Sequence, residues 1–190
     1  IEAAEMMASL DALNQPVNPN SNYPASPLGL GLKQTAKLIK SNAGLEIAFV
    51  ESNGWDTHSR QNVNYGGFTL RARALAQSNA AFWEDLGTLQ DDVVLMTMTE
   101  FGRTVLENGS FGTDHGRASC SFILGNKVKG GKIYGNVPEL ALENLEDSRD
   151  LPVTTDFRSY FATVASEHLN IKDKATLFPG WDGQVLDLFR

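Results

Sequence analysis

The sequence predicts an α/β fold, a three-layer sandwich with a mostly parallel central sheet. Segments with helical periodicity alternate with short, nearly continuous apolar runs. Such runs are typical of strands that are covered on both faces. Polar loops that contain acidic residues and histidines follow two of these runs. Because ligands in α/β folds bind beyond the carboxyl ends of strands, these loops are candidates for a functional site.

The individual elements follow from composition and spacing along the chain. Helices are expected at residues 1–13, where Ala, Met and Leu are frequent, and at 28–41, 69–86 and 156–170, where apolar residues recur at helical spacing. Residues 14–27 are rich in Asn, Pro and Ser, which predicts a loop or a weakly ordered linker. We therefore expect an N-terminal helix and loop over residues 1–22 and a single α/β domain over residues 23–190. The expected strands are 45–52 (LEIAFVES), 93–100 (VVLMTMTE) and 119–125 (SCSFILG).

Composition limits the classes of partner. The chain of 190 residues has a net charge of −7, which disfavours nucleic acid because binding to phosphate backbones requires a basic surface. No apolar run approaches the ~20 residues of a membrane span. A small anionic substrate remains compatible with the acidic chain, because a bound metal ion can invert the local field. The oligomeric state is not predicted.

The first candidate loop contains Asp56, Thr57 and His58. In an extended segment, side chains at positions i and i+2 point to the same side. Asp56 and His58 can therefore converge on one ion, while Thr57 faces away or toward a substrate. An Asp-x-His sequence is weak evidence by itself, and an ordinary surface role is the alternative. Thr57 is also a candidate catalytic hydroxyl, although no motif marks any residue of the chain as an activated nucleophile.

The second candidate stretch begins with Glu100 at the predicted end of a strand and continues through Arg103 to Asp114 and His115. Carboxylates with imidazoles suit Zn²⁺ or Mn²⁺, whereas an all-oxygen set suits Ca²⁺ or Mg²⁺. One or two such ions are expected, and a pair can stabilise an in-line displacement at phosphorus or sulfur. Arg103 could hold the oxyanion with its planar guanidinium. The alternative is that Glu100 and Arg103 pair with each other and that the Asp-His sequence forms a turn.

Several segments together resemble an uncharacterised bacterial family, the domain of unknown function 1501. They are YPASPLGLGLKQTAKLI (23–39), GWDTHSRQ (54–61), VLMTMTEFGRTVLENGSFGTDHG (94–116), KGGKIYG (129–135) and DFRSYFATV (156–164). This family is similar to the alkaline phosphatase and sulfatase superfamily, whose members have an α/β fold with a bimetallic site. The resemblance implies a periplasmic or exported protein, because family members often carry a twin-arginine signal. It also implies that the fold is incomplete at the N-terminus of this chain, where the nucleophile of the superfamily would lie.

The resemblance allows two alignments of the metal ligands. Asp56 and His58 match the first ligand loop of the superfamily, but with a spacing of two residues where four is common. Either Asp114-His115-Gly116 is the Asp-His-Gly motif of the superfamily, or Glu100-Phe101-Gly102 takes that place and His115 is the later histidine. We prefer the second alignment because an apolar strand is predicted directly before Glu100. In it Phe101 replaces a histidine ligand.

Two functions are compatible with these observations. The first is a metal-dependent hydrolase-like domain that acts on phosphate or sulfate esters, with Asp56, His58, Glu100, Asp114 and His115 as metal ligands and Arg103 and Thr57 as catalytic residues. The second is a non-catalytic exported domain that binds a sugar, a cell-wall fragment or a protein partner. Phe101 and the missing nucleophile favour the second.

Overall fold

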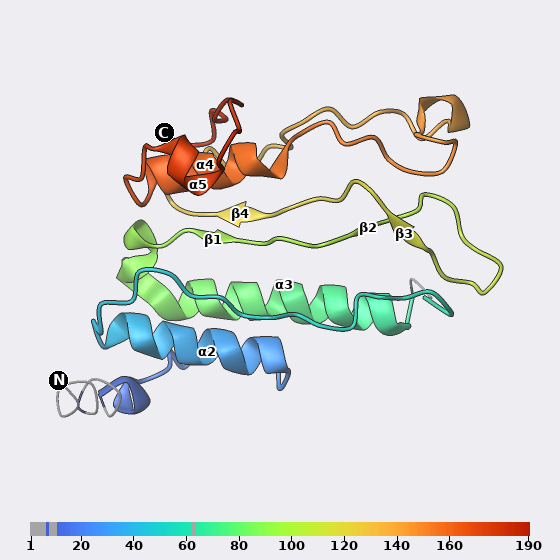
Figure 1. Ribbon diagram of the computed structural model, residues 1–190. Coiled ribbons are helices and arrows are strands. Elements are labelled where there is room, and N and C mark those ends of the chain that lie inside the picture. Colours follow the sequence, from blue (N-terminus) through green and yellow to red (C-terminus); the bar gives the residue numbers. More distant parts are fainter. Residues whose placement is uncertain (1–6, 8–10, 62–63) are drawn as a thin grey trace. The chain divides into compact units, whose positions relative to one another are not determined.

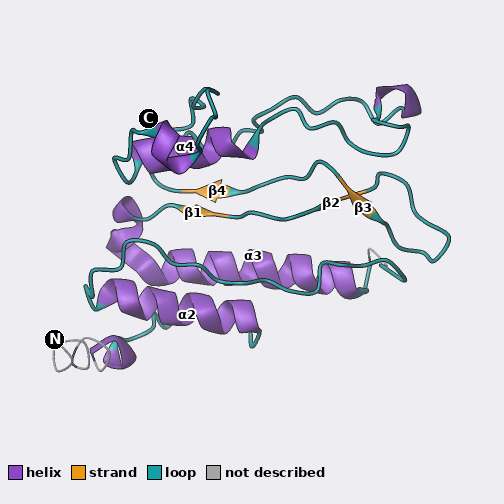
Figure 2. Cartoon of the chain, in the orientation of Figure 1, coloured by secondary structure: helices purple, strands orange, loops and turns teal. Residues whose placement is uncertain are grey.

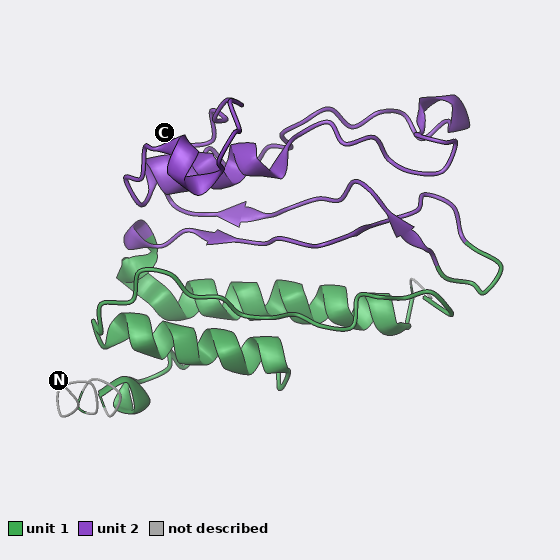
Figure 3. Ribbon diagram, viewed as in Figure 1, with its two compact units in different colours: residues 1–90, 108–112 green, residues 91–107, 113–190 purple. Residues whose placement is uncertain are grey.

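The computed structural model describes residue 7, residues 11–61 and residues 64–190. It divides into two compact units (Figure 3): unit 1 is formed by residues 1–90 and 108–112, and unit 2 by residues 91–107 and 113–190. Most of the helix expected at residues 1–13 lies outside the described residues, although residues 11–14 are helical. The other helices and the strands (Figure 2) are α2 Pro27–Lys40, α3 Gly67–Leu86, η1 Gly87–Asp92, β1 Leu95–Met96, β2 Gly102–Arg103, β3 His115–Gly116, β4 Ile123–Leu124, η2 Leu142–Asn144, α4 Phe157–Glu167 and α5 Lys174–Leu177.

Unit 1 is built on α2 and α3, which lie side by side and run in the same direction (Figure 1). The chain enters α2 at Ser26, whose hydroxyl accepts a hydrogen bond from the backbone N–H of Gly29 at 3.1 Å and so caps the helix. Small and apolar side chains of both helices are buried, among them Ala36 and Phe82. An extended segment, residues 43–61, connects the end of α2 to the start of α3 and runs along the two helices.

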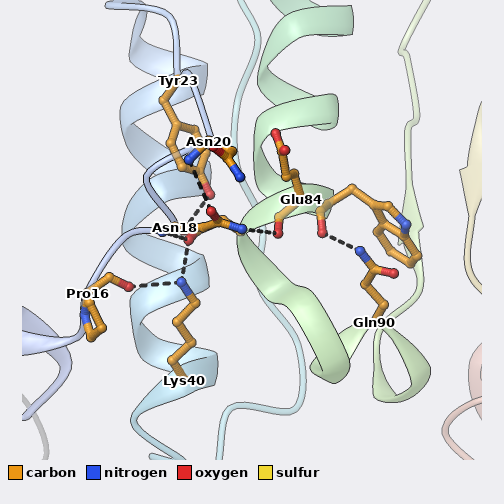
Figure 4. A network of polar contacts seen from close by, with 9 residues as sticks. Pro16, Asn18, Asn20, Tyr23, Lys40, Glu84 and Gln90 are labelled. Atoms are coloured by element: carbon orange, nitrogen blue, oxygen red, sulfur yellow. Dashed lines mark hydrogen bonds and ion pairs between the residues drawn. The ribbon is translucent and has the colours of Figure 1, made fainter.

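A network of polar contacts attaches the Asn/Pro/Ser-rich loop to the C-terminal ends of these helices (Figure 4). The buried carboxylate of Asp85 is part of it. Asp85 of α3 accepts hydrogen bonds from the backbone N–H of Asn18 at 2.6 Å and from the hydroxyl of Tyr23 at 3.0 Å, and it forms an ion pair with Lys40 of α2. Burial of the phenol, and secondarily the charge of Asp85, raise the pKa of Tyr23 far above its usual range. Removing one partner would leave a buried charge poorly compensated, so this network fixes the loop.

The predicted mostly parallel sheet is absent from the described residues, and the sandwich prediction is wrong. Residues 45–52 are extended, but no backbone hydrogen bond joins them to another described segment. Their apolar side chains are not covered as expected, since Ile47 is 71% exposed and Phe49 is 73% exposed. A continuous apolar run shows only that a strand is possible, because a strand also needs a neighbour with which to pair.

Unit 2 contains the two sheets of the described chain, each with two antiparallel strands. β1 pairs with β4, and β2 pairs with β3, so that the chain forms one long irregular hairpin. Between the two sheets, the five residues 97–101 face the six residues 117–122, which introduces a one-residue bulge. The runs at 93–100 and 119–125 were expected to be strands of a mostly parallel sheet. They are antiparallel because a parallel pair requires a crossover connection, and the chain between them contains only a reversal.

The rest of unit 2 is organised around α4. Its N-cap residue Asp156 accepts a hydrogen bond from the backbone N–H of Arg158 at 2.9 Å. Thr163 is fully buried, donates its hydroxyl to the carbonyl of Ser159 at 2.6 Å and accepts the N–H of Leu186 at 2.7 Å. This hydroxyl connects the C-terminal segment to the helix. Within the described residues, no helix has both the length and the apolar character that a membrane span requires.

Candidate functional site

The first candidate loop brings Asp56 and His58 together within unit 1. The Oδ1 atom of Asp56 lies 3.0 Å from the Nε2 atom of His58, and their side chains are 55% and 48% exposed. The i, i+2 spacing in extended backbone places both groups on one side of the chain, as the sequence predicted. Because both groups remain in contact with solvent, a ligand from solution can reach them.

A short segment of the chain, residues 108–112, packs against this loop inside unit 1. The amide of Asn108 donates to the carbonyl of His58 at 2.9 Å, and the N–H of Arg60 donates to the carbonyl of Ser110 at 2.9 Å. Gly112 is buried, and a methyl group there would collide with the carbonyl of His58 and come within 2.6 Å of Ser59 N. The absence of a side chain at Gly112 therefore allows the two backbones to lie in direct contact.

Thr57 lies between the two candidate ligands and points to a different partner. Its hydroxyl donates to the Oε1 atom of Gln61 at 2.8 Å. Next to it in the chain, the ring of Trp55 packs edge-on against Phe68 of α3, with the centroids 5.8 Å apart, and its Nε1 donates to Ser52 Oγ at 3.0 Å. Trp55 thus joins the loop to α3. No group in these contacts marks the hydroxyl of Thr57 as an activated nucleophile.

In unit 2, the hairpin places Arg103 directly opposite His115. The two residues are partners in the antiparallel register, and Gly102 faces Gly116 beside them. The Nε atom of Arg103 donates to Thr113 Oγ1 at 2.9 Å, and its Nη2 atom donates to the Thr113 carbonyl. These two bonds fix the plane of the guanidinium. They also use two of its nitrogen atoms as donors within the hairpin.

Phe101 contacts both of these residues. Its ring stacks on the imidazole of His115 with a centroid separation of 4.2 Å and an angle of 6° between the planes. The guanidinium carbon of Arg103 lies 5.6 Å from the centroid of the Phe101 ring. Glu100 and Asp114, which directly precede Phe101 and His115 in the chain, are exposed. Phe101 therefore orients the imidazole of His115, a role that the alignment with a histidine ligand did not suggest.

The structure thus brings together Asp56 with His58 in unit 1 and Arg103 with His115 in unit 2. Sequence reasoning missed Asn108 and Gln61, which hold the first loop. The Asn-Gly pair at 108–109 was a recognisable turn signal. That signal predicted that the chain turns at this point, but it did not predict which residues the turn would contact.

The Asp56–His58 pair has donor atoms suited to a divalent ion. Two ligands on a tetrahedral Zn²⁺, each ~2.0–2.2 Å from the ion, lie about 3.3 Å apart, close to the observed 3.0 Å. The same separation also suits a direct hydrogen bond between carboxylate and imidazole. The donor set fits Zn²⁺ or Mn²⁺ better than Ca²⁺ or Mg²⁺, because imidazole is a poor ligand for the harder ions.

Comparison with known proteins gives one match. The family described as "Protein of unknown function (DUF1501)" matches residues 33–178, which include every candidate residue named above. No curated protein and no solved structure matches the chain.

Proposed function

The chain belongs to the DUF1501 family, and we propose that it is a metal-dependent hydrolase-like domain that acts on phosphate or sulfate esters. The single observation that carries this proposal is the approach of Asp56 Oδ1 to His58 Nε2 at 3.0 Å in a solvent-accessible loop. One carboxylate and one imidazole provide two ligands of the type that divalent metal sites use in hydrolases. The ion, when bound, would supply Lewis acidity and charge neutralisation for a small anionic substrate.

Asp114 and His115 are the proposed further ligands, and Glu100 is a ligand or a group that orients one. His115 has an exposed imidazole and Asp114 an exposed carboxylate, and both groups are of the ligand types that divalent metal sites use.

The protein side of the chemistry would be divided between binding and orientation. Segment 108–112 holds the carbonyl of His58 and so limits the positions that its imidazole can take. Phe101 does the same for His115 by stacking. Arg103, which lies opposite His115 in the hairpin, would hold the oxyanion. Export to the periplasm remains part of the proposal through the family alone.

Metal titration tests the proposal directly. We expect protein freed of metal with EDTA to bind Zn²⁺ or Mn²⁺ by calorimetry, and His58→Ala and Asp56→Asn to weaken binding at least tenfold. His168→Gln is the matched control, because it removes a histidine that lies outside the candidate site. If the wild-type protein binds neither ion, or if the control loses as much affinity as His58→Ala, the metal site is rejected.

A second candidate function is a non-catalytic binding domain, and the contacts of Arg103 favour it. Two of its donors are used by Thr113, and the imidazole of His115 has one face covered by Phe101. An assay of the metal-loaded protein against aryl phosphates and aryl sulfates separates the two functions. Turnover that is lost in both His58→Ala and His115→Ala supports the hydrolase, whereas metal binding without turnover supports the binding domain.

A further inference from the structure

A second feature of unit 1 is a cavity at the N-terminal ends of α2 and α3. Its volume is about 400 Å³, in the range of small-molecule sites. The start of α2 forms one wall with Leu28, and α3 contributes Leu70 and Arg71. The remaining wall is the extended stretch that includes Ser52 and Asn53, shortly before Asp56 in the chain. Apolar surface and a small number of polar groups therefore meet in one cavity.

Among the described residues that line this cavity, Arg71 is the only cation. Its Nη1 atom donates to the carbonyl of Gly67, one turn earlier in α3, at 3.3 Å. Its Nε and Nη2 atoms lie over Gly54, where a methyl group would approach them to 2.5 Å and 2.7 Å. Gly54 also has a φ of +87°, a conformation that residues with side chains rarely adopt. The glycine therefore leaves room for the guanidinium at the cavity wall.

The electrostatics of the cavity favour an anion with a single charge. The guanidinium presents planar donors that suit an oxyanion, and the N-terminal end of α2 adds partial positive charge. Glu51 also lines the cavity, and among the described residues no ion pair joins it to Arg71. Its negative charge opposes a second charge on the ligand. A phosphate monoester carries close to two negative charges at neutral pH, whereas a sulfate monoester or a carboxylate carries one.

We propose that this cavity binds a singly charged oxyanion attached to an apolar group, with Arg71 as the residue that recognises the charge. The apolar part of the ligand would lie against Leu28 and Leu70. Binding of such an anion does not depend on the proposed metal site. The identification of this anion with the ester group of a substrate rests on the proposed function. If the two are the same, the cavity favours sulfate monoesters over phosphate monoesters as substrates.

Phenyl sulfate, benzoate and phenyl phosphate are suitable probes, titrated by calorimetry into EDTA-treated protein. We expect phenyl sulfate or benzoate to bind more tightly than phenyl phosphate, and Arg71→Ala to weaken binding at least tenfold. Arg73→Ala is the matched control, because Arg73 is on the same helix but exposed and outside the cavity. Tighter binding of phenyl sulfate than of benzoate indicates a sulfate ester, and the reverse order indicates a carboxylate.

Three further variants keep the proposal falsifiable. If Arg71→Ala does not fold, as judged by its thermal transition, Arg71→Lys and Gly54→Ala replace it, and each should weaken phenyl sulfate binding several-fold. Glu51→Gln should improve the binding of phenyl phosphate more than that of phenyl sulfate. Binding that is unchanged in the Arg71 variants, or lost equally in Arg73→Ala, overturns the proposal.

The same variants separate this site from the metal site. In EDTA, His58→Ala should still bind phenyl sulfate, because no residue of the cavity is changed. Arg71→Ala should still bind Zn²⁺ if the metal proposal is correct. If the wild-type protein binds phenyl sulfate but not Zn²⁺, the proposed function is rejected and the anion site stands. If His58→Ala no longer binds phenyl sulfate in EDTA, the anion site is overturned.

Discussion

The ring of Phe101 lies flat on the imidazole of His115, 4.2 Å away and within 6° of parallel. An aromatic contact of this kind contributes about 0.5–1.5 kcal/mol beyond the burial of area. Phe101→Ala should therefore lower the free energy of unfolding by about that amount or more, measured by urea denaturation. Phe101→Tyr, which keeps the ring, should be close to wild type. Equal stability of the Ala and Tyr variants would show that the stack contributes nothing.

The hydrogen bond from Tyr23 to Asp85 predicts a loss of stability in alkali. The pKa of Tyr23 is raised in the folded state, so the folded protein holds this proton more tightly than the unfolded chain does. Its contribution is fully present below the ordinary tyrosine pKa of about 10 and declines as the pH rises beyond it. Tyr23→Phe should show a weaker decline between about pH 9 and pH 11 than the wild type. Tyr134→Phe is the control, and a decline that is equal in all three proteins would contradict the prediction.

His168 predicts the opposite dependence in acid. It ends α4, and burial, followed by the charge of Lys127, lowers its pKa, with Asp92 acting weakly against this. The unfolded chain therefore takes up the proton more readily. Stability should be complete above the ordinary histidine pKa of about 6.5 and should fall as the pH decreases below it. Melting temperatures of wild type and His168→Gln, compared between about pH 7 and pH 5, test this, since the variant should show a smaller fall.

The buried hydroxyl of Thr163 can be tested without changing the shape of the side chain. Thr163→Val leaves the N–H of Leu186 without its acceptor, which should lower the free energy of unfolding by about 1–3 kcal/mol. Thr163→Ser keeps the hydroxyl and should lose less. Chemical denaturation monitored by tryptophan fluorescence is a suitable measurement. A Val variant as stable as the Ser variant would mean that another group accepts this N–H.

Asn108 should affect the stability of unit 1 and the proposed metal site together. Its side chain donates to the carbonyl of His58 and accepts from the N–H groups of Ser110 and Gly112. We expect Asn108→Ala to lower the free energy of unfolding by about 1–3 kcal/mol and to weaken Zn²⁺ binding several-fold. Asn126→Ala removes an exposed amide that bonds Asp91 and is the matched control. A destabilised variant with unchanged Zn²⁺ affinity would separate the segment from the site.

The helices could be predicted from the sequence, whereas the sheet could not. The boundaries of α2, α3 and α4 lie within about three residues of those expected, because caps such as Asp156 and the apolar periodicity are local signals. Strand pairing depends on segments far apart in the chain. The apolar run at 93–100 did not reveal that its partner would be antiparallel, nor that residues 45–52 would have none among the described segments.

In the candidate site too, local contacts could be predicted from the sequence and long-range contacts could not. The spacing of Asp56 and His58 predicted their approach, because it depends on only three residues of extended backbone. The stacking of Phe101 on His115 and the packing of Asn108 on His58 depend on the register of the hairpin and on where its turn lies. Neither can be read from local composition.

The extended segment at residues 45–52 also has a consequence for handling the protein in solution. Exposed Ile47 and Phe49 alternate along a backbone that no backbone hydrogen bond joins to another described segment, and such an arrangement promotes edge-to-edge association. Glu46 and Glu51 flank the four apolar residues 47–50 and act against such association through charge repulsion. Colloidal stability of the isolated chain should therefore decrease with added salt, as screening weakens the protection that these two carboxylates give.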